Sequence, residues 1–163
     1  MIASDTYFLK KALVQAQKAY TQEEVPIGAI LVFKNRIISE GFNLRETQQD
    51  PLAHAEMIAL QKASQKLKSW RLEETTLYVT CEPCLMCAGA LLQARVERLV
   101  YGCLDPKGGA VSSLYQTLRD PRLNHQVSVQ GGVLEEECRE LLQKFFKLRR
   151  GVRVAEGARL ESV

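Results

Sequence analysis

The chain has 163 residues, 46% hydrophobic and 25% charged, which is typical of one soluble globular domain and short for two. Its formal net charge of +3 is too small to indicate a nucleic-acid-binding protein by itself, and no apolar run approaches the length of a membrane span. The first residues, Met1 to Thr6, are mostly polar. We therefore expect no signal peptide, a cytoplasmic location and no membrane partner.

The first part of the chain is predicted to form a helix followed by a β-hairpin. Apolar residues at helical spacing predict an amphipathic helix over residues 6–20. Apolar runs over residues 27–33 and 37–40 predict two strands, and the polar residues 34–36 between them predict a turn. A hairpin makes at least one pair of strands antiparallel.

Helices and strands alternate along the rest of the chain. The predicted helices are residues 53–67, residues 84–94 and a final helix whose apolar stripe runs from Leu134 to Phe145. The predicted strands are residues 76–80, residues 99–103 and a weak strand at residues 127–129. This alternation predicts an α/β fold with three layers, α/β/α, in which helices cover both faces of a mixed sheet.

The cysteine count argues against a disulfide framework. The chain has five cysteines, an odd number, and no predicted export signal. Cys103 and Cys138 lie among apolar residues, and we expect them to be small core side chains. The remaining cysteines, Cys81, Cys84 and Cys87, are closely spaced.

A split signature carries the predicted chemistry: His54-Ala55-Glu56 and, later, Pro83-Cys84-Leu85-Met86-Cys87. One imidazole and two thiolates make a set of three zinc ligands, which leaves the fourth position open for water, as in catalytic zinc sites. Glu56 is not a ligand in this interpretation and is free to move protons. The spacing H-x-E followed by P-C-x-x-C matches the known signature of zinc nucleobase deaminases.

Both halves of the signature fall at the starts of predicted helices. Cys84 and Cys87 are one turn apart on one helix face, and Pro83 suits the first turn of that helix. The positive end of a helix lowers the pKa of a thiol and helps a metal ion to replace its proton. We expect two helix N-termini to meet around one metal ion.

Other interpretations of these residues stay open. Cys81 and Cys84 form a second, overlapping C-x-x-C pair; we favour Cys84 and Cys87 as ligands and expect Cys81, at the end of a strand, to be structural. A C-x-x-C can be a redox pair, but thioredoxin-like proteins need no H-x-E upstream. A lone histidine is often a buried hydrogen-bonding residue, which is the role we expect of His125 in its loop.

From about residue 5 to residue 150 the sequence resembles the bacterial tRNA-specific adenosine deaminases of the cytidine-deaminase-like superfamily. The zinc signature alone indicates only the superfamily, and the flanking blocks favour the tRNA enzymes. These blocks are Val25-Pro26-Ile27-Gly28-Ala29, Gly41-Phe42-Asn43, Asp50-Pro51, Cys81-Glu82, Ala88-Gly89-Ala90, Tyr101-Gly102, Asp105-Pro106-Lys107-Gly108-Gly109-Ala110, Asn124-His125 and Phe145-Phe146-Lys147-Leu148-Arg149-Arg150.

The resemblance implies a five-stranded mixed sheet, a homodimer, and hydrolytic deamination of adenosine to inosine at the wobble position of a tRNA anticodon. It implies one Zn²⁺ per subunit, held by His54, Cys84 and Cys87, with Glu56 as the proton shuttle. It places the deaminase domain in residues 1–150. Residues 151–163 form a tail with little to bury, for which disorder stays open.

The resemblance also implies a substrate pocket and a set of RNA contacts. Asn43 and the backbone N–H of Ala55 are expected to hold the adenine, with Ile27 and Pro26 as walls. The residues expected to contact the tRNA anticodon stem-loop are Asp105, Lys107, Phe146, Arg149 and Arg150. Phe145 continues the apolar stripe of the final helix and is expected in the core.

Two other functions compete with this one. A deaminase of a free base or nucleoside, such as guanine or cytosine, would share the whole zinc signature, but a small substrate needs no basic end at residues 145–150 and no loop at Asp105. A non-enzymatic RNA-binding module stabilised by zinc would need neither Glu56 nor an open ligand position.

Overall fold

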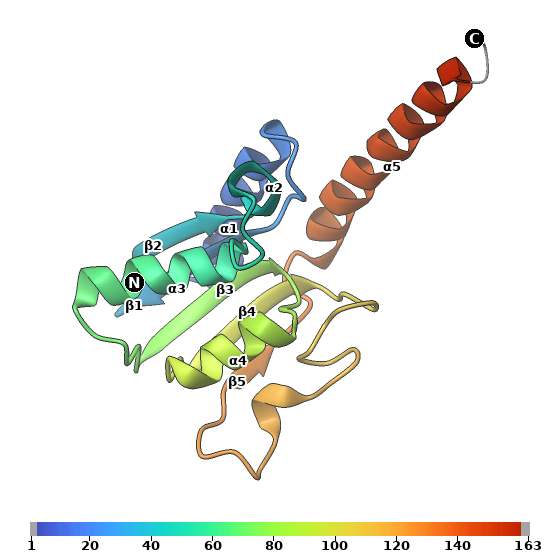
Figure 1. Ribbon diagram of the computed structural model, residues 1–163. Helices are drawn as coiled ribbons and strands as arrows, with labels where there is room; N and C mark the ends of the chain where they lie inside the picture. The colour runs from blue at the N-terminus through green and yellow to red at the C-terminus, as the bar shows by residue number, and fades with distance from the viewer. Residues whose placement is uncertain (1–2, 161–163) are drawn as a thin grey trace.

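The computed structural model describes residues 3–160, with side chains described as far as residue 154 (Figure 1). A five-stranded sheet with the order β2-β1-β3-β4-β5 forms its centre. The strands are β1 (Gly28–Phe33), β2 (Arg36–Phe42), β3 (Thr75–Cys81), β4 (Arg98–Cys103) and β5 (Ser128–Gln130). Strand β1 is antiparallel to both of its neighbours, whereas β3, β4 and β5 are parallel, so the predicted mixed sheet is confirmed.

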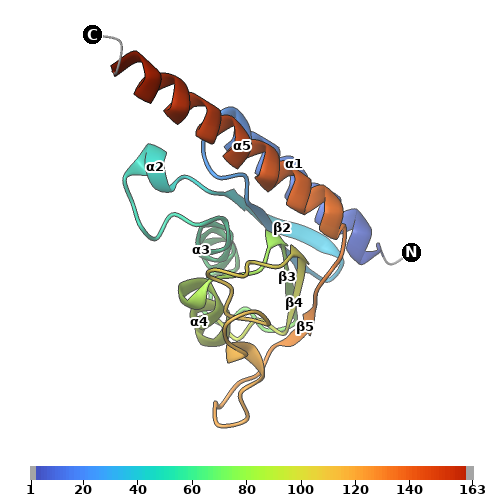
Figure 2. The same ribbon diagram turned by 90° about the vertical axis from the view of Figure 1, so that its right-hand side faces the viewer.

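Helices cover both faces of this sheet, which confirms the predicted three layers (Figure 2). Helices α1 (Asp5–Thr21) and α5 (Glu135–Leu160) lie on one face, and α3 (Ala55–Leu67) and α4 (Leu85–Gln93) lie on the other. Two short elements complete the fold, α2 (Arg45–Gln48) and the 3₁₀ helix η1 (Thr117–Arg119).

The core is divided by the sheet, because successive side chains of a strand point to opposite faces. Leu77 and Val79 of β3 pack in the cluster beneath α3 and α4, together with Leu91. Tyr78 packs in the second cluster beneath α1, together with Phe8. The two clusters hold the two helical layers to a common sheet.

Helix α1 lies unusually close to the start of β1. A Cβ atom at Gly28 would stand 2.1 Å from the carbonyl oxygen of Ala12, so only glycine permits this approach. The start of α1 is held by an ion pair, in which the guanidinium of Arg98 donates to both carboxylate oxygens of Asp5 at 2.7 Å. The hydrogen bonds from Arg98 hold the pKa of the Asp5 carboxyl below its usual value.

The directions of the strands decide where the site forms. Because β1 is antiparallel to both β2 and β3, strands β2, β3 and β4 run in the same direction. Their carboxyl ends therefore lie together along one side of the sheet, which we call the carboxyl edge. Gly28, the first residue of β1, pairs with Phe42, the last residue of β2, and therefore lies at the same edge. Ligands commonly bind at the carboxyl ends of strands in α/β sheets.

The structure differs from the sequence-based elements chiefly in α2, η1 and the length of α5. Helices α2 and η1 are absent from the prediction, because elements of this length carry no apolar periodicity. Helix α5 continues to Leu160, well beyond the predicted apolar stripe. Residues 161–163 of the predicted tail lie outside the described residues, and the division of the chain at residue 150 stays a prediction.

Among the helices that the structure describes, none combines the length and the apolar character that crossing a bilayer requires.

Candidate active site

His54 occupies the position before the first turn of α3. Its backbone is extended, with φ −78° and ψ 152°, and Ala55 and Glu56 follow as the first helical residues. The loop that leads into α3 is fixed by its own backbone: Leu44 donates to the carbonyl of Ala53 at 3.0 Å, and His54 donates to that of Leu52 at 2.8 Å. The imidazole therefore projects from a rigid helix start.

Cys84 occupies the corresponding position of α4, and Cys87 lies in the first turn. The predicted helix starts one residue too early, so Pro83 precedes the helix cap instead of lying in the first turn. Cys84 also forms an isolated antiparallel bridge with Gly109, which ties the start of α4 to the loop after β4.

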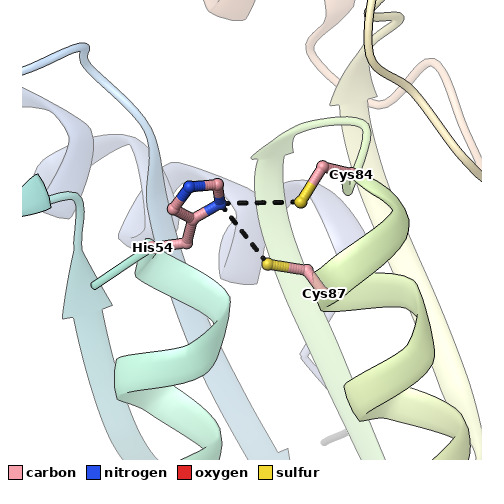
Figure 3. Close-up of side chains that lie close together, drawn as sticks. All are labelled: His54, Cys84 and Cys87. Atoms are coloured by element: carbon pink, nitrogen blue, oxygen red, sulfur yellow. Dashed lines mark hydrogen bonds between the residues drawn. The ribbon is translucent and has the colours of Figure 1, made fainter. Parts of the chain in front are cut away.

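The two helix starts bring three ligand atoms together (Figure 3). Nδ1 of His54 lies 3.6 Å from Sγ of Cys84 and 3.6 Å from Sγ of Cys87. All three atoms lie within 4.8 Å of one another. Zn–S and Zn–N bond lengths in a tetrahedral site place a histidine nitrogen about 3.6 Å from a cysteine sulfur on the same ion. The spacing and the chemistry of these side chains therefore fit zinc.

Cys81 lies outside this group. It ends β3 and is buried with Phe8, Cys103 and Cys138 in the core cluster beneath α1. Cys103 and Cys138 are core side chains, as expected. The choice of Cys84 and Cys87 over the overlapping Cys81 pair agrees with this geometry.

The three clustered groups share their protons unequally. A hydrogen bond from the Cys87 thiol and a second hydrogen bond from His54 lower the pKa of the Cys84 thiol to about 4. The hydrogen bond with Cys84 also raises the pKa of the Cys87 thiol, and the separate hydrogen bond between His54 and Cys84 raises the pKa of His54. The group thus holds a thiolate beside a proton, and a divalent cation with affinity for sulfur can take the place of that proton.

Glu56 is buried, with 4% of its surface exposed, on the first turn of α3. Burial raises its pKa to about 6. A carboxyl group that titrates near neutral pH can both accept and return a proton, which is the property required of a general base that later acts as an acid.

The predicted pocket residues gather at the same edge of the sheet. Pro26 and Ile27 precede β1, Asn43 follows β2, and Ala55 starts α3; Pro26, Asn43 and Ala55 are buried. The Asn43 side chain donates to the carbonyl of Val25 at 3.3 Å and accepts from the Arg45 amide at 3.1 Å. It is therefore oriented by turn contacts on both sides.

The predicted RNA residues lie on two separate segments. Asp105 and Lys107 are in the loop after β4, where Oδ1 of Asp105 accepts from the Lys107 amide at 3.1 Å. On α5, Phe145 is buried as expected, whereas Phe146 is 45% exposed. Arg149 donates to the carbonyl of Glu23 at 2.8 Å, which brings α5 beside the turn that leads into β1.

His125 is not near the clustered ligands. Its Nε2 lies 2.8 Å from the carbonyl oxygen of Val96, in agreement with the expected hydrogen-bonding role.

Two buried carboxylates have no role predicted from the sequence. Glu24 accepts from the amides of Glu46 and Thr47 and so holds the start of α2. Glu82 lies directly after β3, between Cys81 and Pro83, and is 3% exposed. One signal for Glu82 exists in the sequence, because a charged residue stands there between a buried strand and a helix. Burying a charge at such a position costs free energy unless hydrogen bonds or an opposite charge compensate it.

A shallow groove of about 590 Å³ runs along the outer side of α3 and α4. Its lining includes Leu52 and Trp70, which are 55% and 60% exposed, and it does not include the clustered ligands. The groove is thus a feature of the surface separate from the metal-ligand cluster.

Comparison with known proteins identifies close relatives. The family model of the MafB19-like deaminases matches residues 3–150. A tRNA-specific adenosine deaminase of Bacillus subtilis (strain 168) is 50% identical over 146 residues, which are 90% of this chain and 91% of that protein. The protein of the same name from Haemophilus influenzae is 46% identical over 160 residues, which are 98% of this chain and 92% of that protein.

A solved structure shows the same architecture. It comes from studies of A-to-I editing by tRNA:A34 deaminases at the wobble position of transfer RNA. The match has a TM-score of 0.81 and 44% identity, and it covers 84% of this chain and 99% of that one.

Proposed function

This chain belongs to the tRNA-specific adenosine deaminase family, and we propose that it converts adenosine to inosine at the wobble position of a tRNA anticodon by hydrolysis. The observation that carries the hydrolytic deamination is the group of His54, Cys84 and Cys87 beside the buried Glu56, and the tRNA substrate rests on the similarity to tRNA-specific adenosine deaminases. A set of three ligands with a neighbouring carboxylate is the arrangement that deaminates a nucleobase.

We propose that His54, Cys84 and Cys87 hold one Zn²⁺ per subunit. Three protein ligands leave a coordination position free, which distinguishes a hydrolytic site from a structural one. When bound, zinc supplies a Lewis acid that makes water acidic enough to react at neutral pH.

Glu56 carries the protons of the reaction. Its carboxylate accepts a proton from the attacking water and delivers it to N1 of the adenine, while the water oxygen bonds to C6. A second proton, from the hydroxyl that now stands on C6, then passes through Glu56 to the exocyclic nitrogen; the C6–N bond breaks, ammonia leaves, and C6 keeps its oxygen as a carbonyl. Water and adenosine thereby give inosine and ammonia. The buried position of Glu56 keeps this proton from exchanging with bulk solvent.

The pocket residues fix the base during these steps. Asn43 and the backbone N–H of Ala55 hydrogen-bond the adenine, and Ile27 and Pro26 cover it. The turn contacts of Asn43 preset its orientation, so little ordering is needed when the base enters.

RNA recognition uses the rim of the site. Bases in an anticodon loop are already partly unstacked and enter a pocket at low cost. Asp105 and Lys107 contact neighbouring nucleotides, and Phe146, Arg149 and Arg150 hold a base and phosphates. An exposed aromatic side chain next to cations suits this task.

Replacing Arg149 and Arg150 by Gln is expected to weaken binding of the anticodon stem-loop. For each phosphate that is no longer neutralised, the slope of log affinity against log salt should fall by roughly 0.7 to 1. Fluorescence anisotropy over a salt series measures this slope. Because Arg149 also donates to Glu23, the single variant Arg150→Gln separates RNA binding from packing. Arg122→Gln, on the exposed loop after η1, is the charge-matched control. Equal salt slopes for the double variant, for Arg150→Gln and for Arg122→Gln would contradict the proposed phosphate binding.

A direct substrate comparison tests the proposed function. Zinc-loaded protein is expected to form inosine in an anticodon stem-loop with adenosine at the wobble position, and to leave free guanine, cytosine and adenosine unchanged. Liquid chromatography of the digested products measures both. Turnover of a free base alone would keep the zinc chemistry and favour the competing free-base deaminase.

We further propose a homodimer, as the resemblance implies, and a cytoplasmic location. We assign the groove along α3 and α4 to the second copy, because Leu52 and Trp70 in its lining are exposed large hydrophobic side chains.

A further inference from the structure

We propose that Glu82 is a positioning residue that locks the loop after β4, including Asp105 and Lys107, onto the metal-ligand cluster. The inference rests on the proposed function, because this loop is the one assigned to the neighbouring nucleotides of the RNA. Glu82 acts through the loop and is assigned no contact with the substrate or the metal.

Both oxygens of the Glu82 carboxylate accept hydrogen bonds from the loop after β4. Oε1 accepts from three consecutive backbone amides, those of Val111, Ser112 and Ser113, at 3.1, 2.7 and 2.8 Å. Oε2 accepts from the amide of Asp105 at 2.9 Å and from the hydroxyl of Ser113. The two oxygens therefore clamp both ends of the loop, residues 105 and 111–113.

The charge of Glu82 is met by the backbone and not by a cation. Among the described residues, no lysine, arginine or histidine forms an ion pair with it. A buried carboxylate is costly unless strong donors satisfy it, and amides bonded to a charged acceptor are about twice as strong as neutral pairs. The loop conformation and the burial of this charge thus depend on each other.

The same residue is rigidly connected to the metal ligands. The Glu82 amide donates to the carbonyl of Cys103 at 2.9 Å, which extends the pairing of β3 with β4. On its other side, the carbonyl of Pro83 accepts from Ala110 at 2.9 Å, and Cys84 bridges to Gly109. Glu82 consequently sets the position of the loop relative to Cys84.

Gly109 shows how closely the loop wraps the carboxylate. A Cβ atom at this position would lie 2.2 Å from Oε2 of Glu82, so a side chain there would displace the clamp.

The variant Glu82→Gln tests one half of the clamp. Its amide oxygen can still accept from residues 111–113, but its NH₂ group then faces the Asp105 N–H, donor against donor. We expect the Asp105 end alone to open. If the ordered loop falls to about one tenth of the population, KM for the stem-loop rises about tenfold. At saturating RNA the substrate itself holds the loop, so kcat per bound zinc stays near that of the wild type.

Amide hydrogen exchange supplies a readout independent of activity. Exchange at Asp105 should become faster in Glu82→Gln, while exchange at Ser112 and Ser113 should keep its protection. Glu24→Gln is the matched control, a buried carboxylate that holds the amides of residues 46 and 47 in helix α2, and it should leave exchange at Asp105 unaltered.

Unchanged exchange at Asp105, or a loss confined to kcat with KM unchanged, would overturn the proposal. If Glu82→Gln fails to fold, Ser113→Ala removes only the hydroxyl donor, and a smaller rise in KM is expected; no rise would again overturn it. The wild type on the stem-loop separately decides the proposed function. Failure there leaves the exchange measurement to decide whether Glu82 positions the loop.

Discussion

Replacing Glu56 by Gln is expected to abolish inosine formation while the protein keeps its zinc. The amide has nearly the shape of the carboxylate but cannot accept a proton from water. General acid–base catalysis by one positioned side chain contributes about 10²- to 10⁴-fold, and a fall in kcat of this size is expected. Zinc should stay at one equivalent per chain, because Glu56 is outside the set of three ligand atoms.

Single-turnover kinetics with the stem-loop, together with metal analysis of the same sample, measure both quantities. Glu56→Asp is the informative companion, because it retains a titratable group that is withdrawn by one methylene. It should fall between the wild type and the Gln variant. Undiminished turnover in Glu56→Gln would remove the proton-shuttle role from Glu56. RNA binding by the wild type without any inosine formation would instead leave the zinc-stabilised RNA-binding module as the surviving interpretation.

Replacing Cys84 by Ala is expected to release zinc and to abolish turnover. Loss of a Lewis acid removes several kcal/mol of transition-state stabilisation, which corresponds to a fall in rate of about 10³-fold or more. Metal content after dialysis against a chelator, and then the rate of inosine formation, measure the effect.

Cys81→Ala is the matched control, three residues earlier in the same C-x-x-C series. Cys81 is buried in the core cluster on the opposite face of the sheet, so this variant should keep its zinc and its turnover while losing some stability from the small cavity. Equal zinc loss in the two variants would contradict the assignment of Cys84, and not Cys81, as a zinc ligand.

The ligand cluster could be predicted from the sequence because its signal is local. The residue types and spacings of His54, Cys84 and Cys87 imply both zinc chemistry and helix starts, and the structure brings those atoms together. The alternation of apolar segments was likewise enough for the layers of the fold. Even the weak strand was found, displaced by one residue, as Ser128–Gln130.

The roles of Glu82 and Glu24 could not be predicted, because their partners are distant in sequence. Glu82 holds amides 23 to 31 residues away, and Glu24 holds amides 22 and 23 residues away. A carboxylate that bonds backbone amides leaves no pattern in the partner sequence, since every residue type except proline supplies the same donor. The identity of Ser112 or Val111 therefore carries no information about the clamp.

Strands β2, β3 and β4 have their carboxyl ends at the same end of the sheet. The functional residues gathered there fall into two groups, which differ in how well they tolerate replacement. The reacting groups stand on helix starts packed against the sheet, whereas three of the proposed recognition residues, Asn43, Asp105 and Lys107, stand on the connections that follow β2 and β4. Connections tolerate insertion and replacement far better than packed elements do. A descendant or an engineered variant can thus exchange one connection for another and acquire a new substrate with its hydrolytic chemistry intact. The condition on the connection after β4 is that it still offers backbone donors to Glu82.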